Sequence, residues 1–319
     1  MAVDVEGEEA LDLDFPRAHG EVPGAALFRQ ACADFQVDED LGIEPEGRGE
    51  HLYLRIRKSD QNTRWVAKLL GEHFGVDPGL VGHAGLKDRR AVTTQWFSLQ
   101  LPGTEGVPPL PSLAGCEILA AARHPRKLRT GSHRGNRFVI RLRDFTGDVD
   151  GLEARLGLIA AEGVPNYFGE QRFGIDGGNL AEVRRILAMP SPRFKGQRGG
   201  LYLSAARSWL FNQVLAARVR DGSWHAVADG PLWGRGRTIA APEVAVYEEA
   251  VLAPWQPWRH ALEHSGLRQE RRALVLRPEQ LTWWWDGADL VLAFALAPGC
   301  YATAVLRELA VLTAPEPMV

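Results

Sequence analysis

Residues 82–100 have the sequence GHAGLKDRRAVTTQWFSLQ, and the interpretation of the whole chain starts from this stretch. Its glycines indicate a turn, and residues 92–101 are rich in Thr, Trp and Phe, which favours a strand. Between turn and strand stands one acid, Asp88, with three basic residues beside it. An ionised carboxylate can act as a nucleophile or base without a metal, and nearby cations favour that form. The stretch therefore presents Asp88 as a candidate catalytic group, although an aspartate among bases is more often a local ion pair.

Outward from this turn, apolar periodicity predicts further strands and helices. Strands are expected at 51–57, 138–143, 274–276 and 290–297, and helices at 62–75, 151–163, 179–189, 204–219 and 302–312. Strands thus flank both ends of the chain, while the middle is helical. This order predicts an α+β domain made of residues 1–162 and 273–319, with residues 163–272 forming an inserted helix-rich domain.

Length and composition place the chain among ordinary globular proteins. Its 319 residues correspond to roughly two domains. The longest apolar stretch, residues 290–297, has eight residues, whereas about 20 are needed to span a bilayer. The acidic N-terminus lacks the basic-then-apolar order of a signal peptide. The three cysteines lie far apart, so neither a disulfide scaffold nor a cysteine zinc site is expected: Cys32, Cys116 and Cys300. These features predict a soluble, cytoplasmic protein with no membrane partner.

Charge is distributed unevenly along the chain. The net charge is −3, but residues 1–50 hold 14 acids and 3 bases, so the remainder is basic. Residues 120–143 and 183–220 each contain eight lysines or arginines and no acid. Arginine dominates both windows, and its planar guanidinium suits phosphate recognition. The two windows predict a surface that binds a polyanion such as nucleic acid, the alternative being a solvated basic face.

Most short catalytic and nucleotide-binding motifs are absent. The chain has no GxGxxG at a strand–helix junction, no GxxxxGK[ST] and no GxSxG. His260-Ala-Leu-Glu263-His264 matches the HxxEH pattern of one class of zinc peptidase, with both histidines on one helical face. A pattern of five residues recurs by chance, and no third ligand stands out. We therefore expect ordinary surface polarity here and no metal site.

Six stretches, taken together and in order, resemble one family. They are ADFQVDEDLGIEPEGRGEHLYLRIRK (33–58), GHAGLKDRRAVTTQW (82–96), RHPRKLRTGSHRGNRF (123–138), GVPNYFGEQRFG (163–174), RSWLFNQVLAAR (207–218) and GCYATAVLREL (299–309). In these stretches the chain resembles the TruD family of tRNA pseudouridine synthases. The resemblance extends over nearly the whole chain, from about residue 27 to residue 312.

The resemblance implies both a fold and an activity. The expected fold is α+β: a pseudouridine-synthase-like catalytic domain with a mixed, mainly antiparallel sheet, and an inserted TRUD domain. The expected activity is that of an isomerase that converts uridine 13, in the D-arm of tRNA, to pseudouridine. The family implies a cytoplasmic monomer that binds tRNA and needs no cofactor and no metal.

The resemblance also assigns site residues. The catalytic aspartate of the family falls on Asp88, the D of GLKD. Its substrate-contacting positions fall on Phe35, Asn136, Phe138 and Tyr301, and a basic residue before ADF corresponds to Arg29. Many members have Phe where this chain has Tyr301.

The types of these residues suit the reaction. An extruded base loses its stacking, and aromatic faces can restore about 1–3 kcal/mol per base. An asparagine amide offers both a donor and an acceptor to the polar edge of uracil. For each aromatic residue the alternative is ordinary core packing. Whether Asp88 attacks C1′, attacks C6 or abstracts a sugar proton stays open, as does the choice of tRNAs.

Two other classes of function compete with this interpretation. A non-catalytic RNA-binding protein would retain the basic windows but would not depend on Asp88. A zinc peptidase would require a metal together with His260 and His264.

Overall fold

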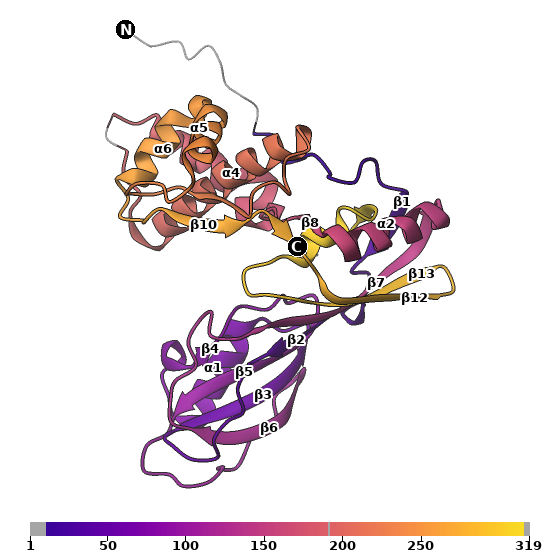
Figure 1. Cartoon of the computed structure of the whole chain (residues 1–319). Helices are drawn as coiled ribbons and strands as arrows, with labels where there is room; N and C mark the ends of the chain where they lie inside the picture. Colours follow the sequence, from indigo (N-terminus) through magenta and orange to yellow (C-terminus); the bar gives the residue numbers. More distant parts are fainter. Residues whose placement is uncertain (1–10, 191, 316–319) are drawn as a thin grey trace. The chain divides into compact units, whose positions relative to one another are not determined.

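The computed structural model describes residues 11–190 and 192–315, which divide into two compact units (Figure 1). The first, called here the sheet unit, contains residues 22–156, 278–302 and the described residues from 309 onward. The second, called the helical unit, contains residues 11–21, 157–277 and 303–308. The helical unit therefore includes four short segments that the sequence analysis placed in the α+β domain: 11–21, 157–162, 273–277 and 303–308.

The sheet unit is built on one mixed sheet. Its main strand order is β12-β13-β7-β2-β5-β3-β6, while β1 pairs with β7 and β14, and β4 pairs with β5. Only the β2–β5 and β1–β14 pairings are parallel, so the sheet is mainly antiparallel, as predicted. The strands are β1 (Gly24–Phe28), β2 (Phe35–Asp40), β3 (His51–Ser59), β4 (Gly82–His83), β5 (Val92–Gln100), β6 (Cys116–His124), β7 (Gly135–Gly147), β12 (Glu279–Asp286), β13 (Asp289–Leu296) and β14 (Val311–Thr313).

Helix α1 (Thr63–Phe74) packs against this sheet and forms its main core. The Asn62 side chain caps the first turn by accepting from the Trp65 backbone amide at 2.7 Å, and Gly75 ends the helix in the left-handed region at φ 67°. The core cluster joins apolar side chains of the helix to those of β3 and β5: Leu52, Leu54, Ile56, Val66, Ala67, Leu70, Val81, Phe97 and Leu99. The sheet and α1 together hold the turn that carries Asp88.

The helical unit is organised around α4 (Gly196–Arg220). Its other elements are α3 (Gly178–Leu187), α5 (Pro242–Val251), α6 (Gln256–Glu263) and two small antiparallel pairs, β9 (Asp229–Leu232) with β10 (Glu270–Ala273) and β8 (Val164–Pro165) with β11 (Val275–Leu276). Trp209 of α4 is buried and contacts the rings of Phe15, Phe173 and Trp255. The fully buried Glu308 carboxylate accepts from the backbone amides of residues 18 and 19, which explains why both terminal segments belong to this unit.

Two further helices and five 3-10 turns complete the elements of residues 11–190 and 192–315. Helix α2 (Val149–Glu162) contains the boundary between the units, and α7 (Ala302–Leu306) follows β13. The 3-10 turns are η1 (Cys32–Asp34), η2 (Pro78–Leu80), η3 (Glu170–Phe173), η4 (Ile175–Gly177) and η5 (Ala253–Trp255).

The prediction of a closing helix over residues 302–312 was wrong beyond its first turn. Helix α7 ends at Leu306, and Val311–Thr313 form β14, which pairs in parallel with β1. Val305 and Leu306 are buried within α7 and Leu309 is buried after it, whereas residues 311–313 supply backbone partners to β1 as a strand. The predicted helix over residues 204–219 is real but starts eight residues earlier, at Gly196. Among the described residues, none of the helices is both long and apolar enough to cross a membrane.

Candidate active site

Asp88 lies in the connection between β4 and β5, which pair in antiparallel fashion. Its side chain is 45% exposed, so the carboxylate is open to solvent while the backbone around it is fixed. Thr63 Oγ1 accepts from the Lys87 backbone amide at 2.9 Å, and Gln95 Nε2 donates to the Gly85 carbonyl at 3.1 Å. Thr63 and Gln95 are themselves joined at 2.8 Å. The sequence therefore builds a hydrogen-bonded turn with one accessible acid.

A buried ion pair anchors the residue that precedes Asp88. Lys87 Nζ lies 2.6 Å from Glu39 Oε2, and the two side chains are 7% and 0% exposed. The other Glu39 oxygen accepts from the Trp96 backbone amide at 3.1 Å. Because a buried charge is costly to leave unpaired, this contact ties the Asp88 turn to β2. The sequence analysis did not identify Glu39, since no local pattern links residues 48 positions apart.

Arg29 is the direct partner of Asp88. Its Nη2 lies 2.5 Å from Asp88 Oδ2, and its side chain is 16% exposed. Arg29 follows β1 with φ 55°, a left-handed conformation that is uncommon for a residue other than glycine. Its guanidinium also lies over the ring of Phe35, 3.9 Å from the centroid, and 5.0 Å from that of Phe28. The structure thus brings three predicted site residues, Arg29, Phe35 and Asp88, into one cluster.

The predicted aromatic residues Phe35 and Phe138 belong to a chain of ring contacts on this sheet. Phe35 contacts Phe28 and Phe138 at centroid distances of 5.8 and 6.0 Å, and Phe138 stacks on Phe294 at 5.4 Å. Phe35 is 3% exposed and Phe138 is 7% exposed. In this conformation their rings pack in the core and support Arg29, so a stacking role for either ring requires it to become accessible. Both assignments stay predictions.

Asn136 is the second residue of β7, the strand that also contains Phe138. Its Nδ2 lies 3.3 Å from His133 Nε2, and its Oδ1 is buried with no hydrogen-bond partner among the described residues. Burial and the nearby Lys87 charge lower the pKa of His133, which favours the neutral ring that can accept from the amide. The Oδ1 lacks a protein partner but is buried, so a contact with substrate requires it to become accessible, as for Phe35 and Phe138, and this assignment also stays a prediction.

Tyr301 is half-buried and immediately precedes α7. It follows β13, whose Leu296 pairs with Asn136. Its role as a base-contacting residue stays a prediction.

Many arginines of the two basic windows already have partners within the fold. Arg123 is 3% exposed and donates to backbone carbonyls, and the remaining engaged residues pair with acids or pack on rings: Arg134 with Asp40, Arg141 with Asp289, Arg143 with Asp34, Arg185 with Glu182, Arg207 with Glu270, and Arg218 over Tyr247. Fewer of the sixteen basic residues are therefore available to bind a polyanion than the sequence suggested.

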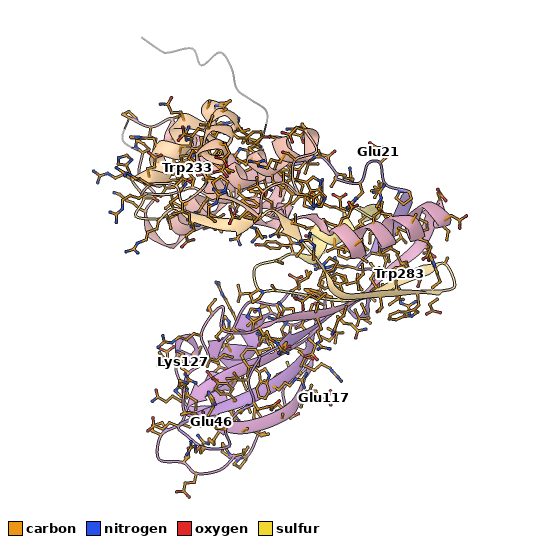
Figure 2. All side chains as sticks on the ribbon, viewed as in Figure 1. Glu21, Glu46, Glu117, Lys127, Trp233 and Trp283 are labelled. Carbon is orange, nitrogen blue, oxygen red and sulfur yellow. The ribbon has the colours of Figure 1, made fainter. Side chains whose placement is uncertain are left out.

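The basic residues that stay available form two shorter groups. Arg126, Lys127, Arg129 and Arg137 are exposed, and Lys127 lies between β6 and β7 (Figure 2). In the helical unit, the exposed members are Arg193, Lys195 and Arg198, around the start of α4. None of these seven makes an ion pair with another described residue.

The HxxEH residues lie at the end of α6, in the helical unit. Potential ligand atoms of His260, Glu263 and His264 all lie within 4.8 Å of one another. One Glu263 oxygen already accepts from Trp233 Nε1 at 2.9 Å, and His264 Nδ1 is 2.8 Å from the His260 carbonyl. The three side chains are close enough to hold a metal ion, but two of them already have other partners. The prediction that the protein needs no metal therefore calls for a direct test.

We expect a His260→Ala/His264→Ala variant to act on its substrate at the wild-type rate, and EDTA to leave that rate unchanged. Neither histidine contacts a residue of the Asp88 cluster in the described contacts. The assay is turnover with and without EDTA. Loss of turnover in EDTA that added zinc restores would contradict the prediction.

Comparisons with known proteins identify close relatives. A family model described as tRNA pseudouridine synthase D (TruD) matches residues 21–189. A tRNA pseudouridine synthase D of Cellvibrio japonicus is 49% identical over 314 residues, covering 94% of this chain and 93% of that protein. A protein of the same name from Methylococcus capsulatus is 44% identical, covering 93% and 94%. A crystal structure of a putative TruD from Methanosarcina mazei superposes with a TM-score of 0.66 at 20% identity, covering 92% of this chain and 95% of that one, which shows a shared fold.

Proposed function

The chain belongs to the TruD family of tRNA pseudouridine synthases and isomerises uridine to pseudouridine in tRNA, and we propose that Asp88 is its catalytic residue and uridine 13 its target. The observation that carries the assignment is the Arg29–Asp88 contact at 2.5 Å, at the tip of a turn fixed from several sides. Asp88 is the exposed acid of that turn, and the chemistry requires one carboxylate near C1′ of the target nucleoside.

The reaction exchanges one glycosidic bond for another without oxidation or reduction. The N1–C1′ bond breaks, the uracil turns, and a C5–C1′ bond forms. N1 gains a proton, and C5 loses its hydrogen to solvent. We assign to Asp88 the step at the nucleoside, to Arg29 the orientation of the carboxylate, and to Asn136 the recognition of the uracil edge through its side-chain amide once the buried Oδ1 becomes accessible.

The proposal also covers the cofactor, the oligomeric state, the location and the domains. No step needs a redox group or a metal, so we propose a cofactor-free enzyme. We also propose, from the family resemblance and the composition, that it is a monomer in the cytoplasm. Residues 1–162 and 273–319 are proposed as the catalytic domain and residues 163–272 as the TRUD domain. Phe35, Phe138 and Tyr301 are proposed to contact the target region of the RNA.

Tritium release from an unmodified tRNA transcript made with [5-³H]uridine tests the proposed activity. Formation of the C5–C1′ bond displaces the label into water, whereas binding alone does not. We expect release that approaches one tritium per tRNA. A protein that binds the transcript without releasing tritium would be an RNA-binding protein, and dependence of all activity on zinc would favour the peptidase class.

The salt dependence of tRNA binding tests whether the exposed basic residues at 126–137 contact the RNA. We expect the affinity for tRNA to fall steeply with salt, because exposed arginines displace counterions from phosphates. An Arg126→Glu/Arg129→Glu variant should flatten the slope of log Kd against log salt by about 0.7–0.9 for each phosphate that the protein no longer neutralises. Filter binding over a range of salt concentrations measures the slope.

The matched control reverses two exposed arginines that already pair with acids. These are Arg48, which pairs with Glu46, and Arg57, which pairs with Glu117. Figure 2 labels the two glutamates. Arg48→Glu/Arg57→Glu changes the net charge equally and should leave the slope near the wild-type value. Equal slopes for both double variants and the wild type would show that residues 126 and 129 are only solvated surface.

A further inference from the structure

Lys58 is a fully buried lysine beside the turn that carries Asp88. It is 1% exposed and lies on β3, where Leu52, Leu54 and Ile56 alternate onto the same buried face. Lysine is almost never fully buried unless its charge is satisfied, because transfer of an ammonium group from water is costly. A hydrophobic residue would continue the alternation at no such cost. The position therefore points to a use for the ammonium group.

The ammonium group joins two backbone segments. Lys58 Nζ donates to the Gln61 carbonyl at 2.6 Å and to the Asp88 carbonyl at 3.1 Å. Gln61 lies between β3 and α1, one residue before the Asn62 cap. Among the described residues, no carboxylate forms an ion pair with Lys58. Its hydrogen bonds thus fix the main chain at Asp88 and just before the start of α1.

The charges around Lys58 are few. Burial lowers its pKa to about 8, and the neighbouring positive charge of Lys87 acts in the same direction. The charge of Asp88 and the thiol groups of Cys116 and Cys32 act in the opposite direction. Burial also raises the pKa of Cys116, so its thiol is neutral near pH 7. Lys58 therefore carries its charge at neutral pH and loses it in mildly alkaline solution.

We propose that Lys58 is a positioning residue for the isomerisation: its hydrogen bond to the Asp88 carbonyl holds the Asp88 backbone so that the carboxylate stays against Arg29. This inference rests on the proposed role of Asp88. Lys58 itself lies beneath the turn and does not reach the substrate. Lys58 then acts with three other contacts that fix the turn, made by Thr63, by Gln95 and by the Lys87–Glu39 pair.

The test compares Lys58→Met with a matched buried cation. Arg123 is also buried and also donates to backbone carbonyls, those of Gly106 and Leu101. Arg123 lies on β6 and pairs with Leu52 of β3. Leu52 is six residues from Lys58 along that strand, so Arg123 is roughly 20 Å from Lys58. Arg123→Met creates the same kind of defect without touching the Asp88 turn.

Three readouts separate positioning from general stability. Lys58→Met should lower the single-turnover rate of tritium release by up to about 100-fold, the cost that a misplacement of about 1 Å can carry, with an unchanged Kd for tRNA. Backbone amides of residues 85–91 should exchange hydrogen faster in Lys58→Met. Arg123→Met should keep the wild-type rate and the wild-type exchange over residues 85–91, whatever its melting temperature.

The pH profile supplies a readout that needs only the folded wild type. A neutral Lys58 amine keeps two N–H donors for its two carbonyl acceptors, but these hydrogen bonds are weaker without the positive charge. The single-turnover rate should therefore decline with a midpoint of about pH 8, and Lys58→Met should lack that inflection. A folded Lys58→Met with the wild-type rate and exchange, or a wild-type profile without the inflection, would overturn the proposal. Activity in Asp88→Asn would instead overturn the proposed function. In that case, faster exchange over residues 85–91 in Lys58→Met would still show that Lys58 holds the backbone at Asp88.

Discussion

Replacing Asp88 with Asn should lower the single-turnover rate of pseudouridine formation by about 10³-fold or more, the scale of losing a group that acts directly on the reacting atoms. Asparagine keeps the size of the side chain, and its Oδ1 can still accept from Arg29. What is lost is the negative charge that attack or proton abstraction requires. Affinity for tRNA should stay within about tenfold, since phosphate contacts supply most of it. Quench assays with excess enzyme measure the rate, and filter binding measures the affinity.

Asp60→Asn is the matched control for this substitution. Asp60 is also an exposed aspartate beside an arginine, with its Oδ1 3.1 Å from Arg89 Nε. Its φ of 53° is left-handed, which asparagine tolerates well. Asp60→Asn should therefore remain fully active. Substantial turnover by Asp88→Asn, or equal losses in both variants, would remove Asp88 from the catalytic role.

The second large effect is expected at Tyr301. If its ring stacks on the target region of the RNA, Tyr301→Phe should retain most activity because the face of the ring is unchanged. Tyr301→Ala should lose about 1–3 kcal/mol of stacking, roughly 5- to 150-fold, mainly in the single-turnover rate. The measurement is that rate for both variants, together with their melting temperatures.

A packing role for Tyr301 predicts a different pattern. Truncating a large aromatic side chain in a core costs about 3–5 kcal/mol of stability. Tyr301→Ala would then melt far below the wild type or fail to fold. A stable but slow Tyr301→Ala supports base stacking, whereas a strongly destabilised variant with a normal rate per folded molecule would make Tyr301 a core residue.

Local sequence signals predicted the elements that depend on local interactions. Helix α1 has its Asn62 cap, its apolar stripe and its Gly75 terminator within fifteen residues, and all three act as expected. The extent of α7 depended instead on a distant partner: residues 311–313 pair with β1, nearly 300 residues earlier in the chain. Strand pairing of this kind overrides helical periodicity, and no local pattern reports it.

The same distinction applies to the candidate site. Asp88 and Arg29 could be assigned from motifs, but their contact at 2.5 Å joins residues 59 positions apart. The basic windows overstated the available charge, because sequence does not show that Arg123 is buried or that Arg143 pairs with Asp34. Lys58 did carry a local signal: it continues the alternation of the buried face of β3, where a lysine is out of place.

The central claim is that Asp88 drives isomerisation of uridine 13, and a tRNA labelled with tritium at C5 of that nucleotide alone tests it most directly. With excess wild-type enzyme, we predict release of about one tritium per tRNA in a single turnover, and no release above background with Asp88→Asn. A wild-type enzyme that binds this tRNA but leaves the label in place would contradict the assigned position. Equal release by wild type and Asp88→Asn would contradict the assigned residue.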